Sequence, residues 1–202
     1  MTTHRPDLDA LYAPPSEMIQ KAVTDRLLDF HVDYLRTATF FCFATGRTSG
    51  LDASPRGGQA GFVQVLDAKR IAFADWPGNN RIESMRNLEE DDRAALLFLF
   101  PGLEVFLRIN GRAHSTVDPE TLELLKEGRR IPKAGIVVDV EEVLFHCGKA
   151  INRARLWRED SKIDRQTLPS VGTILVALAE MRNADIAALD AHYDQSVRNE
   201  LY

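Results

Sequence analysis

The segment 74–87, A-D-W-P-G-N-N-R-I-E-S-M-R-N, combines a turn with side chains that could bind an anion. Proline fixes the backbone angle φ and glycine permits positive φ, so Trp-Pro-Gly predicts a turn after a strand. We predict that a helix capped by asparagine follows, from Arg81 to Leu88. A helix start carries unpaired N–H groups and partial positive charge. With the Arg81 guanidinium and the Ser84 hydroxyl it suits a phosphate, although an ordinary capped helix has the same pattern.

A glycine-rich segment, S-P-R-G-G-Q-A-G-F-V-Q-V, occupies residues 54–65. Its glycines would let the backbone approach a flat ligand closely, and Arg56 could bind an anion. A flexible hairpin loop with a solvated arginine explains this segment equally well.

A third segment, H-C-G-K-A-I-N-R-A-R-L-W at 146–157, predicts a helix from about Cys147 to Trp157. Lys149, Arg153 and Trp157 are four residues apart and would share one helical face, where they could bind a phosphate or a ring. A surface helix whose tryptophan packs on the core is the alternative. Cys147 follows His146 directly, and helix neighbours do not face each other, so we expect no catalytic thiol.

Metal and nucleotide motifs are missing from the sequence. The five histidines and two cysteines are scattered, without H-x-x-x-H or C-x-x-C spacing, so we expect no metal site. No G-x-G-x-x-G follows a predicted strand and no Walker loop occurs, which disfavours a dinucleotide-binding fold.

Composition and charge indicate a cytoplasmic protein without a nucleic-acid or membrane partner. The 202 residues carry a net charge of −5 and no polybasic segment. The two distant cysteines suit a reducing compartment better than a disulfide framework. The N-terminus has no apolar stretch behind a basic head, and the longest apolar run, 94–100, is too short to span a bilayer.

The hydrophobic pattern predicts strands through the middle of the chain and helices around them. The predicted strands are 39–45, 51–56, 61–66, 70–74, 93–100, 105–114 and 135–145. The strand at 93–100 is continuously apolar, which is typical of burial on both faces. Besides the segments above, the predicted helices are 17–36, 119–126, and 170–198 in two pieces divided near Asn183.

These elements predict an α+β fold in which six or more mainly antiparallel strands form a small barrel, with peripheral helices and a helical C-terminus. We divide the chain into an N-terminal arm (1–15), a barrel domain (16–158), and a helical extension (159–202) packed on the barrel. Only one strand pair is separated by a helix-length insert, so a doubly wound parallel sheet is not expected.

The motifs from G-F-V-Q-V-L through A-D-W-P-G-N-N-R-I-E-S-M-R-N to L-R-I-N-G-R-A resemble the flavin-binding half of the pyridoxamine 5′-phosphate oxidase-like superfamily. The S-P-R-G, P-G-N-x-R and H-C-x-K-A motifs are similar to those of an uncharacterised bacterial branch. The resemblance covers roughly residues 35–157. It implies the FMN-binding split β-barrel fold and a homodimer with two FMN sites at its interface.

The resemblance also implies roles for individual residues. The positions that correspond to the cofactor site are Ser54, Arg56, Val63, Gln64, Val65, Asn79, Asn80, Arg81, Ser84 and Lys149. Among these, the turn and helix start at 79–84 would bind the FMN phosphate, and the backbone of 63–65 would lie beside the isoalloxazine ring. The strand end at 54–56 would line the same cleft, and Lys149 would reach the cofactor across a dimer interface.

The sequence departs from the oxidase proper in two places. The C-terminal arginine–histidine pair that handles pyridoxal phosphate has no counterpart, so the resemblance does not extend to pyridoxamine phosphate oxidation. Gly57-Gly58 also replaces the expected Gly-Asp. The leading hypothesis is an FMN-dependent oxidoreductase that uses a small-molecule electron donor or acceptor, with unknown catalytic residues. The alternatives are a flavin or haem module, in which His114 or His146 would be the axial ligand, and an F420-dependent reductase.

Overall fold

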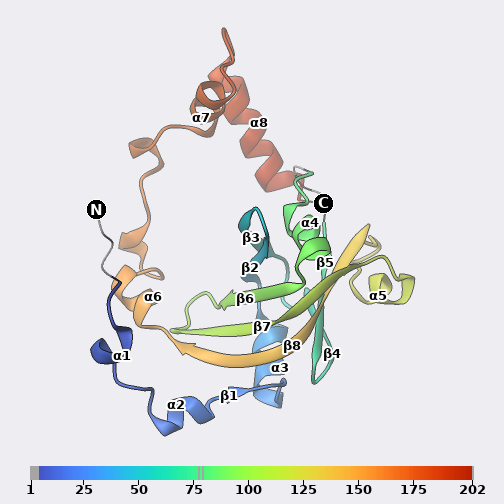
Figure 1. The fold of residues 1–202 in the computed structure, drawn as a ribbon. Helices are drawn as coiled ribbons and strands as arrows, with labels where there is room; N and C mark the ends of the chain where they lie inside the picture. Colours follow the sequence, from blue (N-terminus) through green and yellow to red (C-terminus); the bar gives the residue numbers. More distant parts are fainter. Residues whose placement is uncertain (1–4, 77, 79, 202) are drawn as a thin grey trace.

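The computed structural model describes residues 5–76, 78 and 80–201 and contains one antiparallel sheet (Figure 1). Its strands follow the order β3-β2-β6-β7-β8-β5-β4, and β1 pairs separately with β8. The strands are β1 (Val23–Thr24), β2 (Phe40–Arg47), β3 (Gly50–Gly57), β4 (Val63–Asp67), β5 (Arg70–Asp75), β6 (Arg93–Leu99), β7 (Val105–Thr116) and β8 (Ala134–Cys147). The helices are α1 (Leu8–Leu11), α2 (Glu17–Lys21), α3 (Asp29–Thr37), α4 (Glu83–Glu90), α5 (Pro119–Leu124), α6 (Lys149–Ala154), α7 (Val171–Leu178) and α8 (Ile186–Asn199). The predicted α+β class is confirmed.

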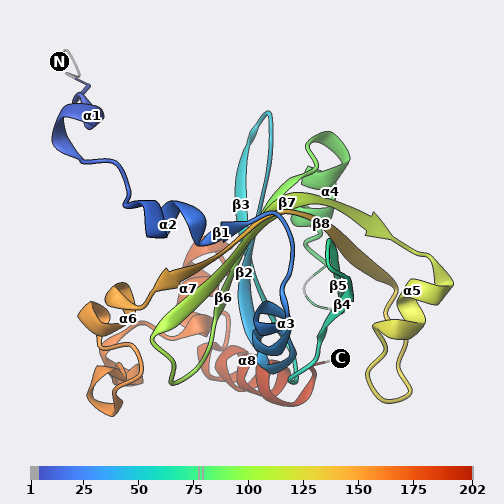
Figure 2. The same cartoon turned by 90° about the horizontal axis from the view of Figure 1, so that it is seen from below.

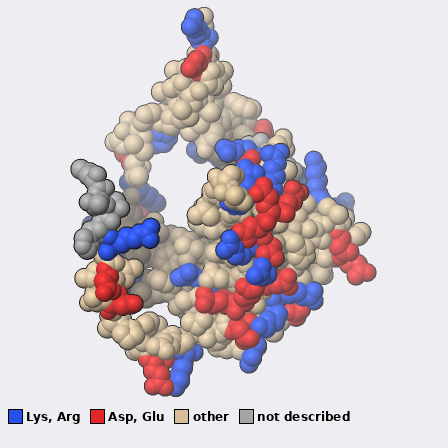
Figure 3. All heavy atoms as spheres, in the orientation of Figure 1, with Lys and Arg blue, Asp and Glu red and all other residues tan. Residues whose placement is uncertain are grey.

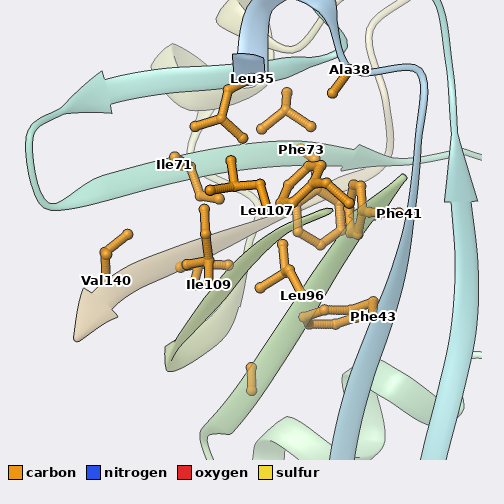
Figure 4. Packing of buried hydrophobic residues seen from close by; sticks show 14 of the residues in the cluster. Leu35, Ala38, Phe41, Phe43, Ile71, Phe73, Leu96, Leu107, Ile109 and Val140 are labelled. Atoms are coloured by element: carbon orange, nitrogen blue, oxygen red, sulfur yellow. The ribbon is translucent and has the colours of Figure 1, made fainter. Parts of the chain in front are cut away.

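The strands curl around a core rich in phenylalanine (Figure 4). Alternate residues of β2 point inward, so Phe41 and Phe43 are fully buried. The Phe41 ring centroid lies 4.8 Å from that of Phe98 and 4.9 Å from that of Phe73. These contacts join β2, β6 and β5. The helix α3 is not part of the sheet but packs against the same core through Leu35.

The prediction that the strand at 93–100 is buried on both faces is wrong for the single chain. Ala94, Leu96 and Phe98 of β6 point into the core and are buried. Leu97 and Leu99, which point the other way, are only half-buried. The second face of this strand is therefore apolar and partly open.

The predicted helix at 17–36 is also wrong, because the structure divides it. Between α2 and α3 the chain forms β1, in which Val23 pairs with Leu144 and Thr24 with Val143. The Leu27 amide then donates a hydrogen bond of 2.8 Å to the Ala68 carbonyl. Pairing with distant strands therefore satisfies the backbone that a continuous helix would have satisfied locally.

Two other predicted helices differ at their ends. The helix α4 begins at Glu83, two residues later than predicted, and its N-cap is Ile82 instead of an asparagine. The helix α6 ends at Ala154, because Arg155 adopts a left-handed backbone with φ of 54°. Trp157 therefore does not share a helical face with Lys149, and its indole donates a 2.8 Å hydrogen bond to the Leu103 carbonyl.

The division of the C-terminal region into two helices is confirmed, with Asn183 between them at a positive φ of 62°. The helices α7 and α8 contact each other, and Asp190 accepts a 2.6 Å hydrogen bond from the Gly172 amide. Figure 1 shows the chain leaving α6, running away from the barrel and returning as α8. Figure 2 shows that α1 and α2 likewise extend away from the sheet. The three-part division of the chain remains a prediction.

Candidate functional site

A cavity of about 530 Å³ lies between β3, the end of β5 and the start of α4. This volume falls within the range of about 300–1,000 Å³ that is usual for small-molecule sites. Polar lining residues within the described part of the chain are Asp52, Ser54, Arg56, Asp75, Asn80, Arg81, Glu83 and Lys133. The cavity therefore combines cations and carboxylates at the turn that the sequence indicated.

Strand geometry explains how these side chains meet. Asp52, Ser54 and Arg56 occupy alternate positions of β3, so they point to the same face. The strand β5 pairs with β8 such that Asp75 is opposite Ala134. This pairing places Lys133, which immediately precedes β8, at the end of β5 where the turn begins.

Arg56 forms the main ion pair of the cavity. Its Nη1 lies 3.0 Å from Asp75 Oδ1, and the two side chains are only 20% and 22% exposed. The Nε atom of the same guanidinium is buried without a hydrogen-bond partner among the described residues. A buried donor without an acceptor is unfavourable, so this N–H would gain from a ligand oxygen.

Three side chains form a hydrogen-bonded cluster beside the cavity. The Ser84 hydroxyl lies 2.9 Å from Asp52 Oδ2 and 3.1 Å from the Ser54 hydroxyl. The Ser54 hydroxyl donates to the same carboxylate oxygen at 2.7 Å. Ser84 is buried, so this cluster joins α4 to β3. The Ser84 hydroxyl would contact a phosphate only by giving up its bond to Asp52.

The N-terminus of α4 lines the cavity and is open, in the sense that its N-cap side chain makes no capping hydrogen bond. Its N-cap residue Ile82 makes no side-chain capping hydrogen bond, and Asn80 adopts a positive φ of 59° just before it. Glu83 lies in the first turn, and its carboxylate is 3.5 Å from both Arg47 and Arg86. The Glu83 carboxylate therefore pairs with two arginines, Arg47 and Arg86, neither of which is among the described residues that line the cavity.

Lys133 was not predicted from the sequence. It lines the cavity, and its ammonium group has no hydrogen bond or ion pair within the described part of the chain. Asp52 was missed as well, although its position two residues before Ser54 places it on the same strand face. No comparable signal exists for Lys133, because its location depends on the pairing of β5 with β8.

The predicted cofactor residues fall into separate groups. Ser54, Arg56, Asn80 and Arg81 line the cavity together, and Ser84 adjoins it. Asn79 lies outside the described residues.

The β4 positions are placed differently. Val63 is buried in the core, and Val65 packs against it. Gln64 donates a 2.8 Å hydrogen bond to the Gly61 carbonyl and lines another cavity, of about 320 Å³, beside Leu125 and Lys126.

Lys149 is the first residue of α6, which follows the C-terminal end of β8. The cavity lies near the other end of that strand, at Ala134. Because β8 has 14 residues at about 3.3 Å each, Lys149 is far from the cavity of its own chain.

The candidate haem ligands do not line this cavity. His114 in β7 and His146 in β8 are exposed, and neither is among its described lining residues. Among the residues that the structure describes, no three acidic, histidine or cysteine side chains group as a metal site would require. In that same part of the chain, no helix is sufficiently long and apolar for a membrane span.

The sheet order and the family comparison define the fold as a split β-barrel. The profile of the family described as pyridoxamine 5′-phosphate oxidase matches residues 27–147, more than half of the chain. The chain therefore belongs to this family. A search of curated proteins found no match.

Several solved structures are similar to part of the chain. HupZ from Group A Streptococcus is 21% identical with a TM-score of 0.46, over 57% of this chain and 90% of HupZ. The FAD binding protein from Mycobacterium smegmatis is 12% identical with a TM-score of 0.42, over 61% of this chain and 97% of that protein. A Clostridium acetobutylicum protein related to general stress protein 26 is 12% identical with a TM-score of 0.44, over 58% and 87%. Likenesses at this level do not bear on what the chain binds.

Proposed function

We propose that the chain binds FMN in the cavity and acts as an FMN-dependent oxidoreductase. It would work in the cytoplasm as a homodimer with a small-molecule electron donor or acceptor. The observation that carries the proposal is the gathering of Arg56, Arg81 and Lys133 around the open start of α4, in a chain of this family. Cations and helix N–H groups together suit a phosphate.

The charges of the cavity support an anionic ligand. Asp75 already pairs with Arg56, and Glu83 pairs with Arg47 and Arg86. Asp52 accepts hydrogen bonds from two serines. The carboxylates therefore have partners of their own, which leaves the ammonium group of Lys133 to interact with a ligand.

The donors of the cavity wall also fit the rest of a flavin. FMN carries a phosphate at one end and ring carbonyl oxygens at the other. The Nε of Arg56, which has no hydrogen-bond partner among the described residues, would donate to such an oxygen, while Arg81 and Lys133 would contact the phosphate. Bound FMN would supply hydride or electron transfer at its N5 edge. The protein residues would bind and orient it, and no general acid or base is assigned.

The direct test is the chromophore of the purified protein. We expect a flavin absorption spectrum, release of FMN on denaturation, and quenching of FMN fluorescence when the stripped protein is titrated. Parallel titrations with F420 and haem separate the alternative cofactors. A colourless protein that takes up no FMN would contradict the proposal.

Turnover distinguishes an enzyme from a binding module. We expect NADH or NADPH to reduce the bound flavin and an added acceptor to reoxidise it over many cycles. Tight FMN binding without reduction by either donor would favour a module that stores or senses the flavin.

A further inference from the structure

The C-terminal arm, defined as residues 159–201, stands away from the barrel of its own chain. Figure 1 shows it as an arc that leaves α6 and returns as α8, and Figure 3 shows an opening that remains between the arc and the barrel when all atoms are drawn. The principal contact of α7 and α8 is with each other. A pair of helices in this position has little of the packing that normally stabilises a helix.

The composition of α7 does not suit a water-exposed helix. Its sequence is V-G-T-I-L-V-A-L, with six aliphatic residues of eight, yet only Gly172 is buried. Leu178 is 80% exposed and Ile174 is 44% exposed. A helix that is apolar on all sides is normally found in a protein interior.

Apolar exposure continues along the rest of the arm. Its exposed large apolar side chains are Ile163, Leu168, Ile174, Leu175, Leu178, Met181, Ile186, Tyr193, Val197 and Leu201. So many exposed apolar side chains in one segment are typical of an interaction site.

The total surface area supports the same conclusion. The described residues expose 14,512 Å², whereas a compact monomer of 22.7 kDa exposes about 9,500 Å². The excess is about 5,000 Å². Obligate dimers bury about 2,000–5,000 Å² in total, so the excess is large enough for such an interface.

The chain itself offers a second unpartnered apolar surface. On the outer face of the sheet, Cys42 pairs with Leu97 and Ala44 with Ala95, and all four side chains are only half-buried. Every copy carries both this face and an arm. In a dimer with twofold symmetry, the arm of each copy can therefore cover the apolar sheet face of the other copy.

We propose that the C-terminal arm is an intersubunit clasp that closes around a second copy of this chain. In the dimer, α7 and α8 bury their apolar side chains against the partner's barrel, and the opening in the arc is filled by the partner. The clasp deepens the homodimer of the proposed function by naming the segment that holds it together, and it does not require a flavin.

The first test compares oligomeric states of full-length variants by light scattering and analytical ultracentrifugation. Ile174 and Leu178 are one helical turn apart, so the double variant Ile174→Glu/Leu178→Glu places two charges on one face of α7. The control is Leu124→Glu/Ile131→Glu, which changes two residues of similar exposure, 57% and 58%, around α5. We expect a wild-type dimer, an unchanged control, and at least a hundredfold weaker dimer for the arm variant, whose circular dichroism spectrum still shows a folded barrel. A monomeric wild type, or an arm variant that dimerises normally, would overturn the proposal.

The second test identifies which barrel the arm contacts. Protein labelled with ¹⁵N is mixed with unlabelled protein, the copies are exchanged, and lysines are cross-linked. The arm contains one lysine, Lys162, and the barrel lysines include Lys69 and Lys133. We expect cross-links from Lys162 to barrel lysines in mixed-isotope pairs. Same-isotope pairs alone would show that the arm folds onto its own barrel and would overturn the clasp. FMN titration of the samples before cross-linking reports separately on the proposed function.

Discussion

Arg56 Nη1 lies 3.0 Å from Asp75 Oδ1, so an ion pair connects β3 to the end of β5 within the cavity. Both side chains are mostly buried, and the guanidinium still has an Nε without a partner among the described residues. The pair therefore positions Arg56 without using all of its donors. It also brings a carboxylate into a cavity that we propose for an anion.

Substitution of the two members of this pair should affect FMN binding differently. Arg56→Gln removes a cation and a donor, so we expect affinity to fall about tenfold or more, about 1.4 kcal/mol. Asp75→Asn removes a repelling charge and keeps the shape, so we expect affinity to be unchanged or up to about tenfold higher. Fluorescence quenching titrations measure both. Equal weakening by both variants would show that the pair has only a structural role.

Arg81 should contribute directly to phosphate binding. We expect Arg81→Ala to weaken FMN binding by about 1–3 kcal/mol, the range for a hydrogen bond to a charged group. Riboflavin, which lacks the phosphate, should bind the variant and the wild type equally. Arg70→Ala, at the other end of β5 and outside the cavity lining, is the matched control. Wild-type FMN affinity in Arg81→Ala would remove Arg81 from the phosphate site.

The hydroxyl of Ser84 should stabilise the junction between α4 and β3. Ser84 is 2% exposed and donates to Asp52, so Ser84→Ala leaves a carboxylate oxygen with one hydrogen bond fewer. We expect the free energy of unfolding without FMN to fall by about 1 kcal/mol in urea titrations. Ser54→Ala should have a smaller effect, because Ser54 is half-buried and water can replace its hydroxyl. An equal or larger loss for Ser54→Ala would contradict this assignment.

Local sequence patterns predicted most elements, because turn residues and periodicity act over short distances. They failed where a distant strand supplied the hydrogen bonds. The residues Val23 and Thr24 lie in a segment with helical periodicity, yet β8 pairs with them. The helix predicted to reach Trp157 ends at Ala154, where Arg155 adopts a left-handed backbone, and the Trp157 indole bonds to the Leu103 carbonyl instead.

The residues of the candidate site likewise divide into those that local motifs predicted and those that depend on long-range pairing. Ser54, Arg56 and Arg81 lie in motifs and were predicted, and the structure brings them to one cavity. Lys133 lies in no motif, and its place in the cavity follows from the register of Asp75 opposite Ala134. Such a register depends on packing of the whole barrel, which no local pattern contains.

Histidine 31 should make the stability of the barrel depend on pH. The His31 ring is 2% exposed, lies 5.3 Å from the Phe145 ring, and accepts a 3.0 Å hydrogen bond from the Leu28 amide at Nδ1. Burial lowers its pKa below the ordinary value of 6.5, so the folded state favours the neutral ring. The unfolded chain binds the proton more readily. The stabilisation is therefore fully present above pH 6.5 and is lost as the pH falls through that value.

The variant His31→Asn isolates this contribution, because an amide oxygen can accept the Leu28 hydrogen bond but does not titrate. Urea unfolding at pH 7.5 and pH 5.5 should show a larger loss of stability for the wild type than for the variant. The two proteins differ only at residue 31, so the comparison isolates the buried ring. If both proteins lost the same stability over this range, the buried ring would have no part in the pH response.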